Sequence, residues 1–243
     1  MTVLLDYLPA LLQGLKTTLA VAVLSIVGCA ITSVLLGIFR SARRLPRRVA
    51  AGAVVELLRG ASALVYLFWA YYALPLIPGM PQLSPFAAAV LVLSLVGGAY
   101  GAEIVRAGIE SVPRGQTDAS RALGLSPFET LRLVILPQAL SQIVPSFGSL
   151  AVDLVKWTTI VSFVGVQDVF YVANNIRNIT YDTVKIYLML AILYWVLCFV
   201  TSVIFRAVEW CLPLNRALRA GQPKALSVFS SWRAGRQPAE LLQ

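Results

Sequence analysis

The sequence of 243 residues contains no histidine. That absence excludes Ser-His-Asp and Cys-His nucleophile systems, as well as metal sites with histidine ligands. Only three cysteines are present, Cys29, Cys198 and Cys211, and their spacing gives neither a disulfide framework nor a CxxC metal motif. We therefore expect three buried, inert thiols and no metal. The sequence also lacks any Gly-Lys pair, so it has no phosphate-binding GxxxxGKS/T loop and is not expected to bind ATP itself.

Charged residues are also scarce. They make up 13% of the chain, whereas 58% of the residues are hydrophobic. An ordinary soluble domain is about 45–50% apolar and about 25% charged, so the composition excludes that class. It equally excludes a disordered chain, which needs high charge and few large apolar side chains. The composition therefore indicates a membrane protein.

Stretches without any charged residue cover residues 17–39, 60–102, 133–152 and 186–205. A helix crosses a bilayer with about 20 apolar residues. The longest stretch is interrupted by four prolines between residues 75 and 85, which predict a turn between two spans. No basic segment precedes the first span, so we expect it to be retained rather than cleaved as a signal. The sequence predicts an all-α polytopic membrane protein with about five transmembrane helices, over residues 12–39, 54–77, 85–105, 139–166 and 185–207.

The basic residues set the expected orientation. Sixteen of the twenty Lys and Arg residues lie in 40–59, in 106–132 or from Arg206 at the end of the last span onward. By the positive-inside rule these segments are cytoplasmic, so the N-terminus is expected outside and the C-terminus in the cytoplasm. This distribution explains the net charge of +9 better by contact with anionic lipid headgroups than by nucleic-acid binding. The predicted organisation is a transmembrane domain over 1–210 and a cytoplasmic basic tail over 211–243.

The longest cytoplasmic loop, residues 106–138, carries the signals of a helix–turn–helix. A helix is predicted over 117–123, and Gly124 follows where a left-handed C-terminal cap is expected. Residues 126–129, Ser-Pro-Phe-Glu, form a capping box with proline at the first helical position. Pro137 then interrupts or ends the second helix. A loop that is merely well capped would explain these signals. A docking surface for a partner is favoured by small side chains that we expect to be exposed, namely Ala119, Ser120 and Ala122.

Several motifs occur in a fixed order along the chain. In the loop, Asp118-Ala119-Ser120 is followed by Gly124 and then by Ile135-Leu136-Pro137. This series resembles the EAA loop of the permease subunits of bacterial ABC importers, with Asp118 in place of Glu and Ser120 in place of the second Ala. Other stretches resemble the polar amino-acid (His/Glu/Gln/Arg/opine) subfamily of these permeases, at residues 56–60, 71–75, 98–104 and 113–116. The resemblance covers residues 12–210 and implies the fold of a type I ABC importer.

The resemblance also implies partners and a mechanism. The chain would be a non-catalytic permease subunit without a cofactor, driven by a dimer of separate ATPase subunits that bind the loop helix in a groove. A second permease, identical or related, would complete the pathway in the bacterial inner membrane. An extracytoplasmic substrate-binding protein would meet the outer loop, residues 166–184. The residues expected to couple to the ATPase are Arg114, Asp118, Ala119, Ser120, Ala122, Gly124 and Pro137, with Asp118 as a polar contact and Gly124 as the turn.

Polar residues within the spans are the candidates for the substrate pathway. Asp153 and Lys156 lie three residues apart, which lets them pair on one helix face. An ionisable residue inside a span is a functional candidate by default, although such a pair can also neutralise itself and only pack against a neighbour. The full set of candidates is Ser62, Tyr66, Tyr100, Glu103, Asp153, Lys156, Trp157 and Thr158.

Two departures from the family pattern bear on the substrate. The family's Lys-Asp-Thr-Ser stretch reads Lys-Trp-Thr-Thr from Lys156, and its earlier Asn-Glu pair is Ser149-Leu150. The loss of both acids argues against a cationic amino acid, while the Trp157 indole offers cation–π contact to a delocalised cation. The stretch at 59–62, Arg-Gly-Ala-Ser, resembles the variant found in ectoine and hydroxyectoine permeases. The expected substrate is therefore a polar amino acid or a related zwitterion, with ectoine or hydroxyectoine as the specific hypothesis.

Three other classes of protein are alternatives to a permease. Intramembrane proteolysis of the rhomboid type needs a histidine, and the aspartyl type needs two facing acids, whereas Asp153 is the single acid deep in a span. An ion-gradient-driven secondary transporter also suits broken helices and buried charges, and it remains the alternative. It would not need the folded cytoplasmic loop. A scaffold without transport would leave Asp153 and Lys156 unexplained.

Overall fold

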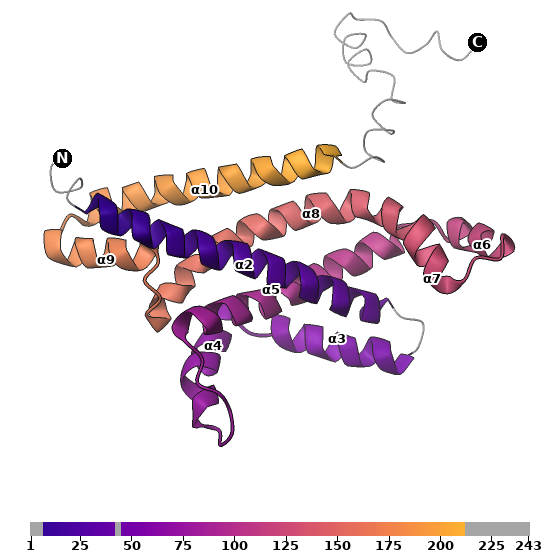
Figure 1. Ribbon diagram of the computed structural model, residues 1–243, viewed down its shortest axis with the longest axis horizontal. Coiled ribbons are helices and arrows are strands. Elements are labelled where there is room, and N and C mark those ends of the chain that lie inside the picture. Colours follow the sequence, from indigo (N-terminus) through magenta and orange to yellow (C-terminus); the bar gives the residue numbers. More distant parts are fainter. Residues whose placement is uncertain (1–6, 42–44, 212–243) are drawn as a thin grey trace, which may run out of the picture.

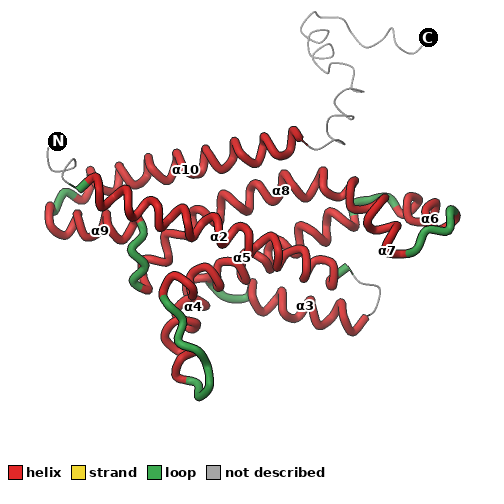
Figure 2. The backbone as a smooth tube through the Cα atoms, in the orientation of Figure 1, coloured by secondary structure: helices red, strands yellow, loops and turns green. Residues whose placement is uncertain are grey.

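The computed structural model describes residues 7–41 and 45–211, and these residues form helices and connecting turns without a β-strand. Four helical segments are long and apolar enough to cross a membrane, and a bent helix pair supplies a fifth candidate span. The four are Leu8–Arg40 (α2), Pro85–Glu110 (α5), Pro127–Val164 and Thr183–Cys211 (α10). They run side by side along the long axis of the molecule (Figures 1 and 2). The expected all-α polytopic membrane fold is confirmed. The predicted basic tail lies outside the described residues, except for Cys211.

The first two long helices, α2 and α5, pack closely because small residues line their contact. Thr32 Oγ1 of α2 donates to the carbonyl of Ser94 at 2.9 Å, and Ser33 Oγ donates to the carbonyl of Gly98 at 3.2 Å. A Cβ atom at Gly98 would collide with Thr32, and one at Gly101 would collide with Ser33. Small residues with hydroxyl cross-links are the usual way in which helices approach each other inside a membrane.

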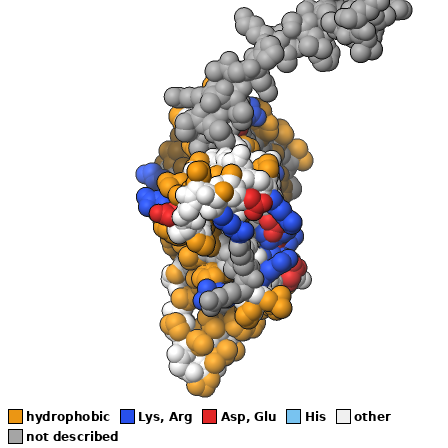
Figure 3. Space-filling model, turned by 90° about the vertical axis from the view of Figure 1, so that its right-hand side faces the viewer, with side chains coloured by type: hydrophobic (Ala, Val, Ile, Leu, Met, Phe, Trp, Pro, Cys, Tyr) orange, Lys and Arg blue, Asp and Glu red, His pale blue; other side chains and the backbone are white. Residues whose placement is uncertain are grey.

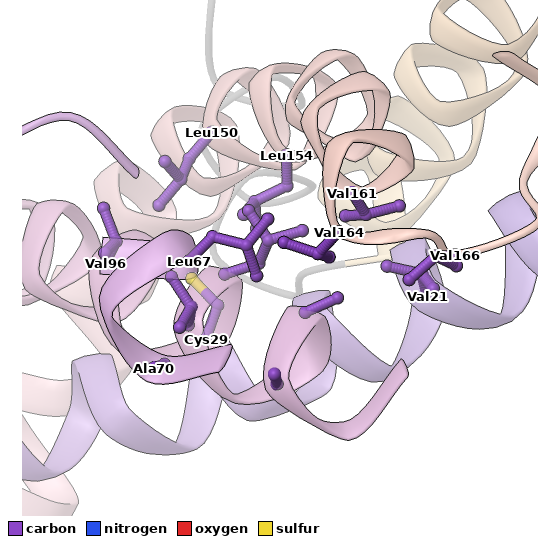
Figure 4. Packing of buried hydrophobic residues seen from close by; sticks show 14 residues of the cluster. Val21, Cys29, Leu67, Ala70, Val96, Leu150, Leu154, Val161, Val164 and Val166 are labelled. Carbon is purple, nitrogen blue, oxygen red and sulfur yellow. The ribbon is translucent and has the colours of Figure 1, made fainter. Parts of the chain in front are cut away.

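The main core lies where α2, α5, α4 (Ala63–Phe68) and α8 (Leu136–Trp157) meet (Figure 4). Leu67, Leu93 and Leu154 are fully buried there and pack with Val21 and Cys29 of α2. The Cys29 thiol is thus buried, as expected. The other two cysteines contradict the expectation of buried thiols, because Cys198 is only partly buried and Cys211 is exposed.

The second predicted span is not one straight helix, so the expectation over 54–77 is wrong in its shape and its start. Helix α3 (Leu45–Arg59) begins nine residues earlier, and the chain resumes as α4 after a break at residues 60–62 with a bend of 94°. Ser62 restarts the helix because its side chain accepts a hydrogen bond from the backbone N–H of Leu64 at 3.3 Å. Beyond α4 the chain continues as a wide turn, η1 (Trp69–Ala73), and a tight turn, η2 (Leu74–Leu76), and it points away from the bundle (Figure 1).

The outer connection, expected as a loop over 166–184, contains a helix, α9 (Val169–Thr180). It follows η4 (Thr158–Val164), the tight helical continuation of α8 that ends at Gly165 with φ 84°. Asp168 caps α9, since its Oδ1 accepts from the N–H of Tyr171 at 2.9 Å. The helix packs through its apolar face onto α2 and α10, which explains why twelve residues too short to span a membrane are ordered there.

The loop over residues 106–138 folds as the expected helix–turn–helix. Helix α6 (Arg114–Ala122) begins three residues before its predicted start, and Gly124 has φ 77° in the turn that follows. The capping box is present, with Ser126 N–H donating to Glu129 Oε2 at 2.8 Å and Glu129 N–H donating to Ser126 Oγ at 3.3 Å. Pro137, however, neither ends nor breaks the second helix. The segment α7 (Pro127–Glu129) passes through a widened turn, η3 (Thr130–Ile135), into α8, and Pro137 follows this turn directly. The helix therefore continues past the proline, with its hydrogen-bond pattern altered just before it.

Candidate functional site

The end of the molecule that carries α6 presents the predicted coupling surface. Arg114, Asp118, Ala119 and Ala122 are exposed on α6, and Pro137 is exposed at the start of α8. Ser120 is only 3% exposed, which contradicts the expectation of an exposed side chain. It is turned inward, and its hydroxyl donates to the carbonyl of Gln116 at 2.6 Å.

Two apolar side chains on this surface were not predicted. Leu123 is 81% exposed and Phe128 is 68% exposed, one on each side of the turn at Gly124. Nothing lies within 4 Å of a Cβ built at Gly124, so its glycine is required by backbone conformation rather than by space. Large apolar side chains that remain exposed to water often mark a surface that contacts another protein. The sequence could have identified Leu123, because it is a large apolar residue directly before the glycine that is predicted to cap the helix.

A network of ion pairs holds α2, α3 and α5 together near the same end. Arg40 of α2 contacts both Glu56 of α3 and Glu103 of α5, and Arg106 bridges Glu103 and Glu110. Glu103, one of the predicted pathway residues, is therefore paired in this network and lines neither of the two spaces formed by the other candidates. Lys and Arg side chains gather over this end of the molecule (Figure 3).

Three of the pathway candidates, Ser62, Tyr100 and Trp157, come together around a cavity of about 230 Å³ beside the break between α3 and α4. The Tyr100 and Trp157 rings meet edge to face with centroids 5.7 Å apart. The Arg59 guanidinium lies over the Tyr100 ring, 5.0 Å from its centroid. Tyr66 does not line this cavity, because its hydroxyl donates to the carbonyl of Leu57 at the end of α3.

Asp153 and Lys156 lie apart from those aromatic rings, in a polar groove of about 430 Å³ between α8 and α10. The Lys156 ammonium donates to Asp153 Oδ1 at 3.0 Å, and about half of each side chain is exposed. Ser149, Ser202, Arg206 and Glu209 line the same groove. Thr158 is separate again, fully buried with its hydroxyl donating to the carbonyl of Val155 at 2.8 Å. An exposed ion pair on a membrane helix is stable only where protein or a water-filled space covers it.

A buried carboxylate that the sequence did not single out lies at the other end of the molecule. Asp168 is fully buried, and its Oδ2 has no hydrogen-bond partner. Thr18 accepts from the N–H of Val169 at 3.0 Å, so the start of α9 is tied to α2. Burial raises the pKa of Asp168 to about 6, against the lowering effect of the backbone N–H groups that it accepts from. Within residues 7–41 and 45–211, no three Cys, Asp or Glu side chains are grouped as metal ligands.

Comparison with known proteins connects these features to one family. Residues 31–209 match the model of binding-protein-dependent transport system inner membrane components. A probable amino-acid ABC transporter permease of Sinorhizobium fredii is 36% identical over 84% of this chain and 87% of its own length. The glutamine transport system permease of Escherichia coli K12 is 32% identical, covering 83% of this chain and 92% of the relative.

Comparison with solved structures points to the same family. A chain of an amino acid ABC transporter crystallised with histidines matches with a TM-score of 0.77 and 30% identity, over 85% of this chain and 95% of its own. A chain of the MetNI methionine ABC transporter in an inward-facing conformation shares the fold at 22% identity, with a TM-score of 0.69 over 84% of this chain and 98% of its own. Both neighbours have the type I importer fold, which is thereby confirmed for this chain. The family match, the relatives and the fold together show that the chain belongs to the binding-protein-dependent inner membrane components, the permeases of amino-acid ABC transporters.

Proposed function

We propose that this chain is the non-catalytic permease subunit of an ATP-driven importer for a polar amino acid or a related zwitterion. The observation that carries the proposal is helix α6, a short amphipathic helix at one end of the molecule, with small exposed side chains and with two large exposed apolar ones on the turn that follows it. A secondary transporter has no use for such a surface.

Helix α6 and its turn would couple to a separate ATPase. The exposed Ala119 and Ala122 let another protein approach the helix backbone closely, while Leu123 and Phe128 supply apolar contact area. Asp118 would add a polar contact, because its carboxylate is only loosely paired with Arg121 at 3.8 Å. The continuous path from α7 through η3 into α8 connects this surface to the helix that carries Asp153 and Lys156. Movement of α6 would therefore tilt the pathway helix.

Two permeases, identical or related, would enclose the pathway. The ion pair on α8 is half exposed in the single chain, and α10 buries little of its apolar surface. A second permease facing this groove would cover both and leave a polar lane between the subunits. The charges of Asp153 and Lys156 are complementary to those of a zwitterion.

We expect the distribution of basic residues to set the orientation of the chain in the membrane. The end with α6, α3 and the basic side chains would face the cytoplasm, with α9 on the opposite side of the inner membrane (Figures 1 and 3). An extracytoplasmic substrate-binding protein would then deliver the substrate near α9. The domain would extend over residues 1–210, with the basic tail beyond it in the cytoplasm.

The substrate hypothesis depends on Trp157. This indole stands where the family pattern has an acid, and it shares a cavity with Tyr100 and Ser62. An aromatic cavity without a carboxylate suits a zwitterion with a delocalised cation, such as ectoine or hydroxyectoine, better than it suits arginine.

The test is ATPase stimulation in proteoliposomes that hold the permease, its ATPase and its substrate-binding protein. Ectoine, glutamine and arginine are supplied in turn. We expect stimulation by a zwitterion and none by arginine, and we expect Trp157→Asp to abolish the preference. Stimulation by arginine in the wild type would keep the importer and refute the aromatic-site argument. Failure of any ATPase to co-purify would favour a secondary transporter.

A further inference from the structure

The break between α3 and α4 places an arginine next to the aromatic cavity, and this arginine forms no ion pair within residues 7–41 and 45–211. Arg59 is the last residue of α3, and its guanidinium lies over Tyr100, whose ring lines that cavity. We propose that Arg59 binds the carboxylate of the transported zwitterion, while Tyr100 and Trp157 pack on the rest of the molecule. This inference deepens the proposed function and rests on it.

No acidic side chain of the described residues neutralises Arg59. The carboxylates of α3 and α5 are paired elsewhere, Glu56 with Arg40, Glu103 with Arg40 and Arg106, and Glu110 with Arg106. The Nε atom of Arg59 is buried and has no hydrogen-bond partner. A buried donor on a charged group is costly to leave unpaired. A carboxylate that binds the outer N–H groups of the guanidinium would offset the cost of the buried charge.

Two interactions stabilise the charge of Arg59 without using its N–H groups. Contact with the Tyr100 ring is a cation–π interaction, and the C-terminal end of α3 carries partial negative charge. Both hold the guanidinium in place. Its planar fork of donors matches a carboxylate in two-point geometry.

The cavity fits a small substrate. Its volume of about 230 Å³ is below the roughly 300–1,000 Å³ of sites for drug-sized ligands, so it suits a single amino acid or a molecule of that size. Its lining is mainly apolar and aromatic, with the Ser62 hydroxyl as a polar group beside the break. The Arg59 guanidinium lies over Tyr100 and outside that lining, and it would orient a zwitterion by its carboxylate while the aromatic rings pack on the rest of the molecule.

A lipid phosphate shares the chemistry of a carboxylate and is the other source of an anion. The position of Arg59 favours the substrate. Arg40 reaches the carbonyl of Gly52, and Arg59 lies seven residues further along α3, roughly 10 Å deeper by helical rise. The basic residues that contact headgroups would lie at the start of α3, where Arg47 and Arg48 are exposed.

The test compares Arg59→Met and Arg59→Lys with the control Arg47→Met, which removes the same charge from the exposed end of the same helix. The complex of permease and ATPase, with its binding protein, is reconstituted in vesicles of phosphatidylcholine with and without phosphatidylglycerol. Uptake is measured for ectoine and glutamine. The same complex in nanodiscs without binding protein is then melted with each compound, with its primary carboxamide and with inorganic phosphate.

We expect Arg59→Met to lower uptake at least about tenfold in both vesicle types. Arg59→Lys is expected to fall between, and Arg47→Met to match the wild type. The carboxylate compound should raise the melting temperature of the wild type but not of Arg59→Met, and the carboxamide should raise neither. A structural role of Arg59 would lower basal ATPase activity and the melting temperature of the unliganded complex instead.

The other results are also decisive. Normal uptake by Arg59→Met, or equal stabilisation of wild type and variant by the carboxylate, overturns the site while the importer stands. An effect of Arg59→Met that appears only with phosphatidylglycerol assigns the arginine to a lipid headgroup and overturns the proposal. Absence of uptake by the wild type, together with stabilisation that depends on Arg59, keeps the carboxylate site and refutes the importer.

Discussion

The buried carboxyl of Asp168 predicts that the stability of this permease increases as the pH falls. Burial raises the pKa of Asp168 from its ordinary 3.8 to about 6 in the folded chain. Because the folded pKa is the higher one, the folded protein binds the proton more tightly than the unfolded chain does. The carboxyl therefore causes no loss of stability below about pH 4, and the loss grows through pH 6 and is constant above it.

The size of the effect follows from the two pKa values. The full penalty above pH 6 is about 3 kcal/mol, since each pKa unit corresponds to about 1.4 kcal/mol. About half of it has developed by about pH 5, so acidification from about pH 7.5 to about pH 5 should recover about 1.4 kcal/mol.

The matched variant is Asp168→Asn. An asparagine at this position keeps an acceptor for the Tyr171 N–H at the start of α9, since Asn is as good an N-cap as Asp, and it does not titrate. The assay is thermal unfolding of the complex in nanodiscs over that pH range. We expect the melting temperature of the wild type to rise on acidification and that of Asp168→Asn to change much less. Equal pH dependence in the two proteins would show that Asp168 is not the group responsible and would refute the reasoning.

Further predictions concern the turn and the helix contact. Gly124→Ala places a side chain at φ 77° in open space, so it should cost about 1–2 kcal/mol in the turn and weaken stimulation of the ATPase while leaving the membrane helices folded. Co-purification of the ATPase and its stimulated rate measure this, and unchanged stimulation would argue against a role for the turn. Gly98→Leu inserts a side chain against Thr32 and should prevent α2 and α5 from packing, so that little folded protein is recovered from membranes. Ala107→Leu, at an exposed position of the same helix, is the control. Normal yield of Gly98→Leu would contradict the close contact.

Much of the fold follows from the sequence because a membrane requires long apolar helices. The charge-free stretches locate α2, α5, α8 and α10, and the Ser126–Glu129 capping box and Gly124 locate the cytoplasmic turn. The break at residues 60–62 was not predicted, because the charge-free stretch continues across it and its signal is one capping serine. Helix α9 was missed because it is too short to span a membrane and is ordered by packing on α2 and α10.

The candidate site was only partly predictable for a related reason. Helical spacing was enough to pair Asp153 with Lys156. Contacts between segments far apart in the sequence cannot be deduced from helical spacing. Glu103 was therefore expected in the pathway, although it pairs with Arg40, sixty-three residues earlier. Arg59 was counted as a cytoplasmic charge because the start of α3 is basic. Only the fold places its guanidinium over Tyr100.

Measuring the energy source of transport distinguishes an ATP-driven importer from a secondary transporter. The permease is reconstituted with its ATPase and binding protein in vesicles, and uptake of labelled substrate is measured with ATP supplied to the ATPase side, then with a proton or sodium gradient and no ATP. If the chain belongs to an ATP-driven importer, we expect uptake to require ATP and the binding protein. We expect uptake to be unchanged when ionophores collapse the gradients. Uptake driven by a gradient in the absence of ATP would contradict it.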